Sequence, residues 1–568
     1  MNESSGAPVS TSHPEVLARE AIDSFHQGNV QKALDQALLL IHITDFEAEM
    51  SHLVGACFHQ LTSYEEALPF LRRAIISNPL ESAYLNTYGV VLRKAALFEQ
   101  SSRSYEKAIA LDPKFSDAFY NRGNVLVELK RKDQAADNFR RCLELNPTHN
   151  NAHHNLANIY RDRKKIDLAL EHYQRSDECQ HFNPDMHCNW GLALQLKEHW
   201  SRAIDRFEVA INQKSDHAPS YVNLGGALAV QERFTEACAS FRRGVELDSN
   251  CLDAKFNLGL TLLTIGQLEE GWKFYETRLS LPKKVITPFP DIPVWDGCLD
   301  LDSPLLVWAE QGYGDNIQFV RYIPILIEMG INVVLSTRKP LISLFQKCLM
   351  PSAPPIIEHR RQDLQGFSHH IPLLSLPRVL NTSMSTIPRM PGYLKPPVDI
   401  PDKLRLKRQP FALNIGLVWA SGADNKDMYE DKSMKLDSLM PMFDNWRNER
   451  LLVIHSLQVG VDSEDVNPWL NQWGVVDWSH SLESFYDTAV VVKQLDLVIS
   501  VDTAVAHIAG AMDVPVWLML QHNADFRWLR GRDDSPWYNS MTLFRQKALG
   551  DWDSVVLKIS NRLKQLLG

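Results

Sequence analysis

The sequence repeats itself with a period of 34 residues, and this repeat limits the possible folds more than any other pattern in the chain. One column of the repeat holds a small residue, which is glycine in six of its seven occurrences although the 568 residues include only 26 glycines. A chance alignment of this quality is an event of about one in a million, so the sequence contains copies of one structural unit. The column consists of Gly55, Gly89, Gly123, Ala157, Gly191, Gly225 and Gly259.

Two further columns and a set of prolines indicate what the unit folds into. Alanine recurs twelve residues after the small residue, and a large residue recurs four residues later. Small residues let two helices cross closely, a large side chain fills the adjoining space, and proline ends a helix, so the unit is a helical hairpin. The members are Ala67, Ala135, Ala169, Ala203 and Ala237, then Leu71, Tyr105, Phe139, Tyr173, Phe207, Phe241 and Tyr275, with Pro79, Pro113 and Pro147.

This pattern resembles the tetratricopeptide repeat over about residues 47–285. Ala21 and Ala33 indicate a degenerate unit that begins near Pro14, so the predicted repeat domain spans residues 14–285. Such repeats stack into an all-α solenoid with an extended concave surface. The resemblance implies that the first helix of each hairpin lines that surface.

Five asparagines share one phase of the repeat, two residues before the small column. A single asparagine in a helix is usually a solvated position, because its amide competes for backbone hydrogen bonds. A row of amides can instead hold the backbone of an extended peptide, since each amide offers donors and an acceptor. The row resembles the asparagine ladder of the O-linked N-acetylglucosamine transferases and implies an acceptor polypeptide bound by Asn121, Asn155, Asn189, Asn223 and Asn257.

Composition narrows the class of protein. The formal net charge of −10 argues against a nucleic-acid backbone as the main partner. The eight cysteines are scattered without a CxxC pair, which is typical of a reduced cytoplasm. The first residues lack the apolar segment of a secretion signal, and the most apolar run, residues 495–520, contains three aspartates and a histidine. We therefore expect a cytoplasmic protein without a membrane span.

The pattern changes after the repeats. Prolines are concentrated in and around residues 286–303, which we interpret as a linker. Short apolar strands then alternate with helices, which is the pattern of a parallel sheet covered on both faces. We predict a GT-B-like α/β region of two Rossmann-like halves that face each other across a cleft, residues 304–410 (acceptor side, with the connecting proline-rich stretch) and residues 411–568 (donor side).

Two loops of the α/β region are candidate sites, because ligands of such folds bind where strands end and helices begin. The loop "EQGYGDN" puts Asp315 at a helix start, where an aspartate is also a common N-cap. The loop "ISVDTAVAHIAGA" puts Asp502 and Thr503 at the start of a helix whose free N–H groups suit a phosphate. His507 follows one turn later on the same face and points back towards that start.

The segments "EQGYGDNIQFVRYIPIL", "IPLLSLPRVL", "ISVDTAVAHIAGAMDVPVWLML" and "DSPWYNSMTLFRQ" resemble the glycosyltransferase domain of bacterial tetratricopeptide glycosyltransferases, which has the GT-B fold and is related to heptosyltransferases. The resemblance implies that Asp315 is the general base, and that Asp502, Thr503 and His507 bind the donor. It also implies that Lys432 contacts the donor phosphate. The heptosyltransferase motif S-x-G-D reads G-Y-G-D here, so Tyr313 alters the acceptor side and the donor need not be ADP-heptose.

The resemblance therefore implies a metal-independent protein O-glycosyltransferase without a cofactor, acting on Ser or Thr of a polypeptide such as flagellin. Its donor would be a CMP-linked nonulosonic acid such as pseudaminic acid, or a nucleotide sugar like ADP-heptose. Gln458 lies at a strand end, where its side chain either contacts the donor or has a packing role within the fold. The D-x-D triplets at 300–302 and 551–553 lie in the linker and at the last helix, so we assign no metal.

The sequence leaves a second function open. In this alternative, the chain is a non-catalytic repeat scaffold or chaperone whose transferase-like region has lost its catalytic activity. The segment "DFRWLRGRDDSPWY", with Arg527, Trp528, Arg532, Trp537 and Tyr538, either stacks on a nucleotide or holds the second half together. Donor hydrolysis by the purified protein discriminates between the two functions.

Overall fold

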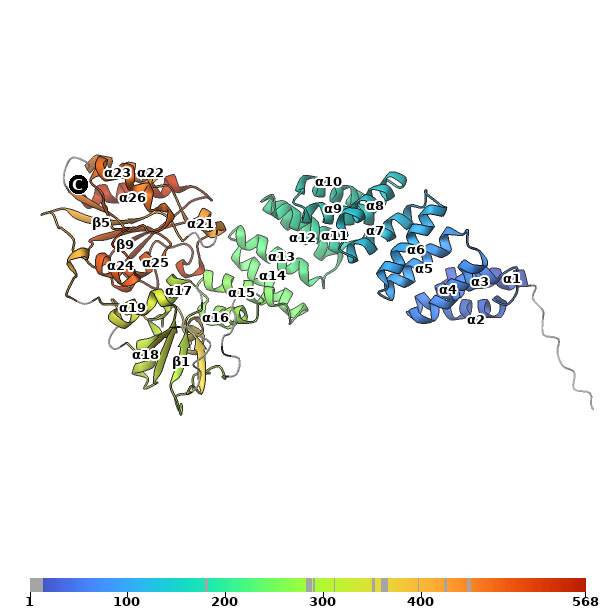
Figure 1. The fold of residues 1–568 in the computed structure, drawn as a ribbon, viewed down its shortest axis with the longest axis horizontal. Coiled ribbons are helices and arrows are strands. Elements are labelled where there is room, and N and C mark those ends of the chain that lie inside the picture. Colours follow the sequence, from blue (N-terminus) through green and yellow to red (C-terminus); the bar gives the residue numbers. More distant parts are fainter. Residues whose placement is uncertain are drawn as a thin grey trace, which may run out of the picture. The chain divides into compact units, whose positions relative to one another are not determined.

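A computed structural model describes residues 14–178, 182–281, 289, 292–310, 312–349, 353–358, 366–396, 398–422, 426–446 and 451–567. The chain separates into two compact units that divide between Asn223 and Leu224 (Figure 1). The described part of the first unit is helical, and the second unit contains the remaining repeat helices and the α/β region. The predicted fold class, an all-α solenoid followed by an α/β region with parallel sheets, is confirmed. The domain boundaries drawn at residues 285, 303 and 410 stay predictions.

The solenoid consists of helical hairpins in direct succession. The hairpin predicted from Ala21 and Ala33 is present, and both alanines are fully buried in its core. The helices are α1 (Pro14–His26), α2 (Val30–Leu40), α3 (Glu47–Gln60), α4 (Tyr64–Ser77), α5 (Ser82–Lys94), α6 (Phe98–Leu111), α7 (Ser116–Glu128), α8 (Lys132–Leu145), α9 (Asn150–Asp162), α10 (Ile166–Glu178), α11 (Pro184–Gln195), α12 (Trp200–Gln213), α13 (Ala218–Val230), α14 (Phe234–Leu247), α15 (Leu252–Thr264) and α16 (Leu268–Tyr275).

The glycine column faces the column of large residues within each hairpin. A Cβ atom on Gly123 would lie 2.5 Å from Cε1 of Phe139, and one on Gly191 would lie 2.4 Å from Cε1 of Phe207. Interiors are close-packed, so a methyl group at either position would force the ring to move. At Gly89, Gly123, Gly191 and Gly225 the two columns therefore occur together because an aromatic ring occupies the space that the missing side chain leaves.

Another column, at the turn inside each hairpin, is visible only in the structure. One turn residue has a left-handed backbone, with φ between 57° and 61° in six successive hairpins. These residues are Thr62, Ala96, Lys130, Lys164, Glu198 and Glu232, and Gly28 and Gly266 take the corresponding place in the first and last hairpins. L-residues are disfavoured there, so the fold imposes this conformation on side chains that do not favour it.

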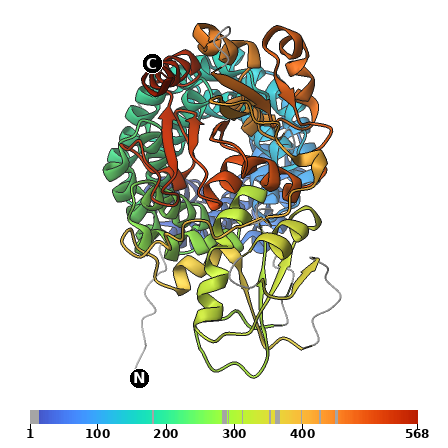
Figure 2. The same cartoon turned by 90° about the vertical axis from the view of Figure 1, so that its left-hand side faces the viewer.

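Two separate parallel sheets form the α/β region, as predicted (Figure 2). The first has the order β3-β2-β1-β4, and the second has the order β10-β9-β8-β5-β6-β7, which is the doubly wound Rossmann order. The strands of the first are β1 (Leu305–Trp308), β2 (Val333–Thr337), β3 (Ile356–Glu358) and β4 (His369–Pro372). Those of the second are β5 (Leu413–Val418), β6 (Leu452–Ser456), β7 (Val476–Asp477), β8 (Leu497–Val501), β9 (Val516–Leu520) and β10 (Met541–Arg545).

Helices connect these strands and cover the sheets. Every residue of β8 and of β9 is buried, as expected of strands covered on both faces. The helices are α17 (Tyr313–Phe319), α18 (Tyr322–Glu328), α19 (Lys339–Cys348), α20 (Leu376–Val379), α21 (Lys426–Lys432), α22 (Leu436–Leu439), α23 (Asn467–Trp473), α24 (Phe485–Val492), α25 (Ala504–Ala511) and α26 (Trp552–Leu567).

The last hairpin is packed directly against the α/β region. The ring of Trp272 in α16 lies 5.9 Å from Phe319 of the first half, and 5.7 Å from Phe526 and 6.4 Å from Trp537 of the second half. The described part of the predicted linker is packed too, since Trp295 is completely buried. Among the described helices, none combines the length and apolar character that a membrane crossing requires.

Candidate functional site

The candidate site is built at the points where the strand order of each sheet reverses. In the first sheet the reversal lies between β1 and β4, and in the second between β5 and β8. Ligands of doubly wound folds bind outside the carboxyl ends of the strands at such points. Asp315 follows β1, Lys432 lies on the helix after β5, and Asp502 follows β8, so the fold brings three of the predicted residues to the two reversal points.

Asp315 links the two halves. Its Oδ1 forms an ion pair with the guanidinium of Arg527, which is 212 residues away in the sequence. Its Oδ2 accepts the N–H of Gly312 at 3.0 Å, and Gly312 is the N-cap of α17. The cap interpretation of Asp315 therefore needs correction, because Asp315 is the third helical residue and supplies the return bond of a capping box. Burial raises the pKa of Asp315, and Arg527 opposes that rise.

Asp502 lies between Lys432 and His507 in the second half. Its Oδ2 accepts a hydrogen bond from Lys432 Nζ at 2.8 Å, and its Oδ1 lies 3.8 Å from His507 Nε2. Burial opposes ionisation of Lys432, but Asp502 outweighs it and raises the pKa of Lys432. Burial likewise opposes the charge of Asp502, but Lys432, His507 and Arg527 together bring the pKa of Asp502 well below its usual value. The pair of Asp502 and Lys432 is therefore ionised at neutral pH.

His507 is a neutral imidazole enclosed by aromatic rings. Its Nδ1 lies 2.9 Å from the hydroxyl of Tyr538, and its ring stacks on Trp528 with a centroid separation of 5.3 Å. Burial and the nearby Arg527 lower the pKa of His507 to about 3. A Cβ atom on Gly314 would lie 2.7 Å from the imidazole, so only glycine lets the first turn of α17 approach His507 this closely.

Thr503 is the N-cap of α25, but its side chain does not cap the helix. Its Oγ1 lies 3.1 Å from the hydroxyl of Ser500 instead. The first N–H groups of a helix have no partner within the helix, so the start of α25 keeps donors that an anion could accept. Phosphate binding at the start of α25 stays a prediction.

The side chain of Gln458 forms hydrogen bonds to the backbone of its own half. Its Oε1 accepts the backbone N–H groups of Trp419 and Ala420 at 3.3 and 3.1 Å, and its Nε2 donates to the Val459 carbonyl. The side chain thus fixes the end of β5, which favours the packing role that the sequence left open. Contact with a donor stays a prediction for this residue.

Arg527 is the residue whose importance the sequence did not reveal. Its guanidinium is buried beside Asp315, 3.5 Å from Asp525, and close to Asp502. Burial opposes its charge, but these three carboxylates raise the pKa of Arg527. The segment "DFRWLRGRDD" is rich in arginine, but no sequence pattern indicates that one of these arginines pairs with Asp315, which is about two hundred residues earlier.

Glu310, the other acidic residue of the segment "EQGYGDN", forms a structural ion pair with Arg278. Its carboxylate accepts hydrogen bonds from Arg278 at 2.6 and 3.1 Å and from the backbone N–H of Leu374 at 3.2 Å. Both side chains are buried, and burial raises the pKa of Glu310. Glu310 therefore ties the loop to the end of the solenoid rather than facing a substrate.

The five ladder asparagines are half-buried, and each lies on the first helix of its hairpin. Four of them are bonded to the preceding repeat. Asn121 Nδ2 donates to Asn86 at 3.1 Å, Asn155 Nδ2 donates to Asn124 at 2.7 Å, Asn189 Oδ1 accepts from Arg161 at 2.7 Å, and Asn223 Nδ2 donates to Cys188 Sγ at 3.2 Å. These bonds fix the orientation of the amides, while peptide binding by the ladder stays a prediction.

Metal binding has no support from side-chain clusters in the described part of the chain. No group of three His, Cys, Asp or Glu side chains among those residues has the arrangement of a metal site. The seven described cysteines are all free thiols.

Comparison with known proteins supports the repeats. Residues 116–149 and 218–251 each match the family described as tetratricopeptide repeat. Protein FlbA of Caulobacter vibrioides (strain ATCC 19089 / CIP 103742 / CB 15) is 24% identical over 336 residues, which are 53% of this chain and 53% of FlbA. The chain thus spans about half the length of this curated relative.

Among solved structures, the chain is similar to YrrB, a TPR protein with an unusual peptide-binding site, at 22% identity and a TM-score of 0.30, covering 32% of this chain and 95% of YrrB. It is also similar to pilF of Pseudomonas aeruginosa at 20% identity and a TM-score of 0.35, covering 37% and 96%. The chain carries tetratricopeptide repeats, and the family model matches two of them directly.

Proposed function

We propose that this chain is a protein O-glycosyltransferase that moves a sugar from a nucleotide-sugar donor to a Ser or Thr hydroxyl of a polypeptide. The observation that carries the proposal is the cluster around Arg527, which pairs with Asp315 of the first half and whose charge also acts on Asp502 and His507 of the second half. A carboxylate opposite an uncapped helix start is the arrangement that an acceptor hydroxyl and a donor phosphate require.

In the proposed reaction the donor phosphate sits at the start of α25 with Lys432 beside it. As the bond between the anomeric carbon and the phosphate oxygen breaks, negative charge grows on the phosphate, and Lys432 and the helix N–H groups stabilise that charge. Asp502 holds Lys432 in position through the 2.8 Å bond. His507 contributes as a neutral hydrogen-bonding group, because its pKa of about 3 keeps it uncharged at neutral pH.

Asp315 acts as the general base in this proposal. It accepts the proton of the Ser or Thr hydroxyl as the oxygen attacks the anomeric carbon. Both carboxylate oxygens already accept one bond, from Arg527 and from Gly312, but each oxygen has a second lone pair. The raised pKa of Asp315 favours proton acceptance.

The acceptor polypeptide lies along the ladder asparagines in this proposal, and flagellin is one acceptor that the family resemblance suggests. The donor is a CMP-linked nonulosonic acid or an ADP-heptose-like nucleotide sugar. Because backbone-directed contacts contribute about 1 kcal/mol each, single Asn→Ala changes should be nearly silent. A triple change at Asn155, Asn189 and Asn223 should weaken acceptor binding without affecting donor hydrolysis.

The test uses the purified chain with a panel of CMP-, ADP- and UDP-sugars and measures nucleotide release. Lys432→Ala should lower the rate by about 10²–10³-fold with every donor that the wild type hydrolyses. Lys435→Ala is the matched control, because this exposed lysine is three residues away and should leave the rate unchanged. Equal rates for wild type and Lys432→Ala would contradict the proposal that Lys432 binds the donor phosphate at the start of α25.

Asp315 needs its own control because it also neutralises Arg527. Asp315→Asn should lower transfer to a polypeptide by about 10²–10⁴-fold. Asp525→Asn also removes a carboxylate next to Arg527, 3.5 Å from it, but leaves the base in place. If both variants lose transfer equally, charge balance around Arg527 explains the loss and Asp315 is not the base.

One observation favours the alternative of a scaffold without chemistry. In the structure Lys432 is paired with Asp502 and Asp315 is paired with Arg527, so both predicted reactive groups already have partners of opposite charge. A scaffold would bind polypeptide through the solenoid but release no nucleotide from any donor of the panel. That combined result would support the scaffold and exclude the transferase.

A further inference from the structure

A pocket recurs on the solenoid where the second helix of one hairpin meets both helices of the next. The first copy, of about 300 Å³, lies between α4, α5 and α6, and another, of about 240 Å³, lies between α8, α9 and α10. The lining residues of the two are separated by two 34-residue periods, so Arg72, Ile75, Leu85 and Lys107 of the first have Arg140, Leu143, His153 and Arg175 as counterparts in the other. The repeat thus provides an internal comparison of two pockets with one backbone.

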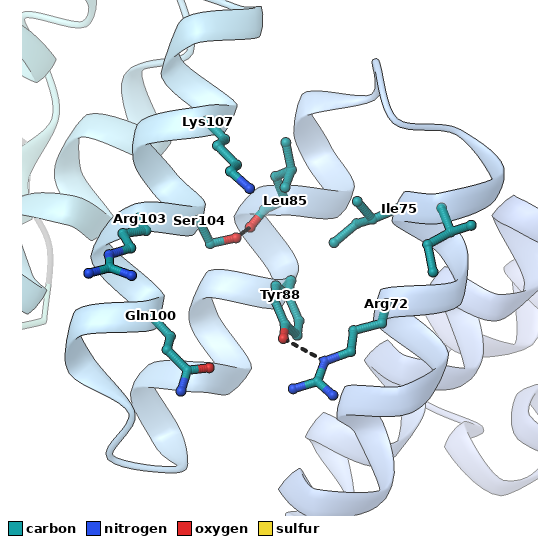
Figure 3. Close-up of a pocket in the computed structure, with 9 residues that line it drawn as sticks. Arg72, Ile75, Leu85, Tyr88, Gln100, Arg103, Ser104 and Lys107 are labelled. Atoms are coloured by element: carbon teal, nitrogen blue, oxygen red, sulfur yellow. Dashed lines mark hydrogen bonds between the residues drawn. The ribbon is translucent and has the colours of Figure 1, made fainter.

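The first pocket combines an apolar floor with a cationic rim. Ile75 of α4 and Leu85 of α5 form the floor, and Ile76, also from α4, is 80% exposed. Figure 3 shows Arg72 on the α4 side and Arg103 and Lys107 on the α6 side, with Leu85 and Tyr88 between them. Ile75, Ile76 and Leu85 line the same pocket, and an apolar surface rimmed by polar residues is a typical feature of a docking site.

Among the residues that the structure describes, the three cations of this rim have no acidic partners. Arg72 donates to the hydroxyl of Tyr88 at 2.8 Å, and within the described chain none of Arg72, Arg103 and Lys107 forms an ion pair. Glutamates and aspartates outnumber lysines and arginines in the whole chain, 69 to 59. A local group of three unpaired cations is therefore contrary to the overall charge of the protein.

The second pocket has lost both properties. Glu144 stands where the first pocket has Ile76, and Glu171 stands where it has Arg103. Arg175 pairs with Glu171 at 2.7 Å and Arg140 pairs with Asp137 at 2.5 Å, so the cations there are neutralised within the solenoid. The shape of the pocket follows from the repeat, whereas the unpaired charge and the exposed isoleucine belong to the first copy.

We propose that the first pocket binds a short peptide segment in which apolar side chains are flanked by carboxylates. The apolar side chain enters between Ile75, Ile76 and Leu85, and the carboxylates pair with Arg72, Arg103 and Lys107. An acidic peptide fits better than a nucleic acid, because the floor is aliphatic and its one aromatic side chain, Tyr88, is already bonded to Arg72. This site is separate from the proposed transferase chemistry and needs no nucleotide sugar.

The test measures fluorescence anisotropy of a labelled peptide Asp-Glu-Leu-Leu-Glu-Asp with the full chain. We expect a dissociation constant on the order of 10⁻⁵–10⁻⁴ M that rises with salt. The double variant Arg72→Glu, Lys107→Glu should weaken binding at least tenfold. The matched control is Arg140→Glu, Arg175→Glu, which reverses the same two positions in the second pocket and should leave binding within twofold of wild type.

Two further peptides test the chemistry of the ligand. Asn-Gln-Leu-Leu-Gln-Asn removes the carboxylates, Asp-Glu-Ser-Ser-Glu-Asp removes the apolar side chains, and each should bind at least tenfold more weakly. The proposal is overturned if the wild type does not bind the acidic peptide at 1 mM, or if both double variants lose binding equally. Tighter binding of a single-stranded oligonucleotide that competes with the peptide would also overturn it. A failed donor hydrolysis assay would leave this result unaffected.

Discussion

The solenoid and the α/β region are held together by contacts of very different reach along the sequence. In the solenoid, Gly123 faces Phe139 within one hairpin, and Asn121 bonds Asn86 of the preceding hairpin. In the α/β region, Arg527 pairs with Asp315 across 212 residues, and Lys432 pairs with Asp502 across 70. Short, repeated contacts make each unit of the solenoid nearly self-sufficient, whereas the candidate site exists only when the whole α/β region has folded.

The largest effect should come from removing the long-range cation. Arg527→Met leaves Asp315 and Asp525 buried or half-buried without their cation, so the free energy of unfolding of the α/β region should fall by about 3–5 kcal/mol. Urea unfolding followed by tryptophan fluorescence reports this, because most tryptophans follow residue 290. Arg532→Met is the control, since Arg532 pairs with an exposed Asp534 two residues away and should cost about 0–1 kcal/mol.

The local contact of the solenoid can be broken by a single methyl group. Gly123→Ala should lower the free energy of unfolding of the solenoid by about 1–3 kcal/mol, because the new Cβ would lie 2.5 Å from the Phe139 ring. Adding Phe139→Leu should recover part of the loss, as measured by a double-mutant cycle with circular dichroism.

Gly226 serves as a control for Gly123, because its replacement by alanine should raise the free energy of unfolding rather than lower it. Gly226 lies in helix α13, and a Cβ atom there would meet nothing within 4 Å beyond the backbone of its own helix. Gly226→Ala should therefore raise the free energy of unfolding by about 0.5–1 kcal/mol, since alanine favours the helix more than glycine does. Equal effects at Gly123 and Gly226 would mean that the glycine column has no packing role.

Acid should weaken the α/β region through His507. Its pKa of about 3 in the folded chain lies below the value of about 6.5 expected when unfolded, so the unfolded state binds more protons between these values and stability falls as pH falls. Between about pH 7.5 and pH 5 the loss should be about 2 kcal/mol. His507→Gln should flatten the pH dependence of the α/β transition by that amount.

A histidine of the solenoid provides the comparison. Burial lowers the pKa of His154 to about 4, so His154→Gln should flatten the pH dependence of the solenoid transition and leave that of the α/β region unchanged. An unchanged slope of the α/β transition in His507→Gln would show that other groups determine its acid sensitivity.

A small effect is also expected at the left-handed turn column. Lys130 has φ 59°, which glycine adopts without strain, so Lys130→Gly should raise the stability of the solenoid by up to about 1 kcal/mol. Gln134→Gly, in the adjoining helix α8, should lower stability by about 1 kcal/mol because glycine is a poor helix former. Thermal unfolding of both variants distinguishes turn strain from a general effect of glycine.

Prediction from sequence was most complete where the residues of one contact recur in phase. The glycine, alanine and aromatic columns predicted the hairpins, and even the degenerate first hairpin followed from Ala21 and Ala33. The turn column could not be predicted in this way, because Thr62, Ala96 and Lys130 share a backbone conformation without sharing any side-chain chemistry.

Within the α/β region, the sequence located loops but not their partners. The strand-end rule located Asp502 and Thr503 directly after β8, and Asp315 in the first turn of the helix that follows β1. It could not show that Glu310 is buried against Arg278, or that Gln458 binds the backbone after β5. Both side chains are polar and near a strand end, and only their surroundings distinguish a structural residue from a residue that faces a ligand.

The repeat, the parallel α/β character and the loops that follow the strands could be predicted from the amino-acid sequence, because they depend on side-chain periodicity over a few turns or strands. The pairing of Arg527 with Asp315 became visible only in the folded chain. The same holds for the cations of the two solenoid pockets, which within the described residues lack acidic partners in the first pocket and are neutralised in the second. The energy of a charge depends on which charges lie within a few ångströms of it and on how far water is excluded. Which charges lie close together is set by the folded chain, so it cannot be inferred from the order of the residues alone.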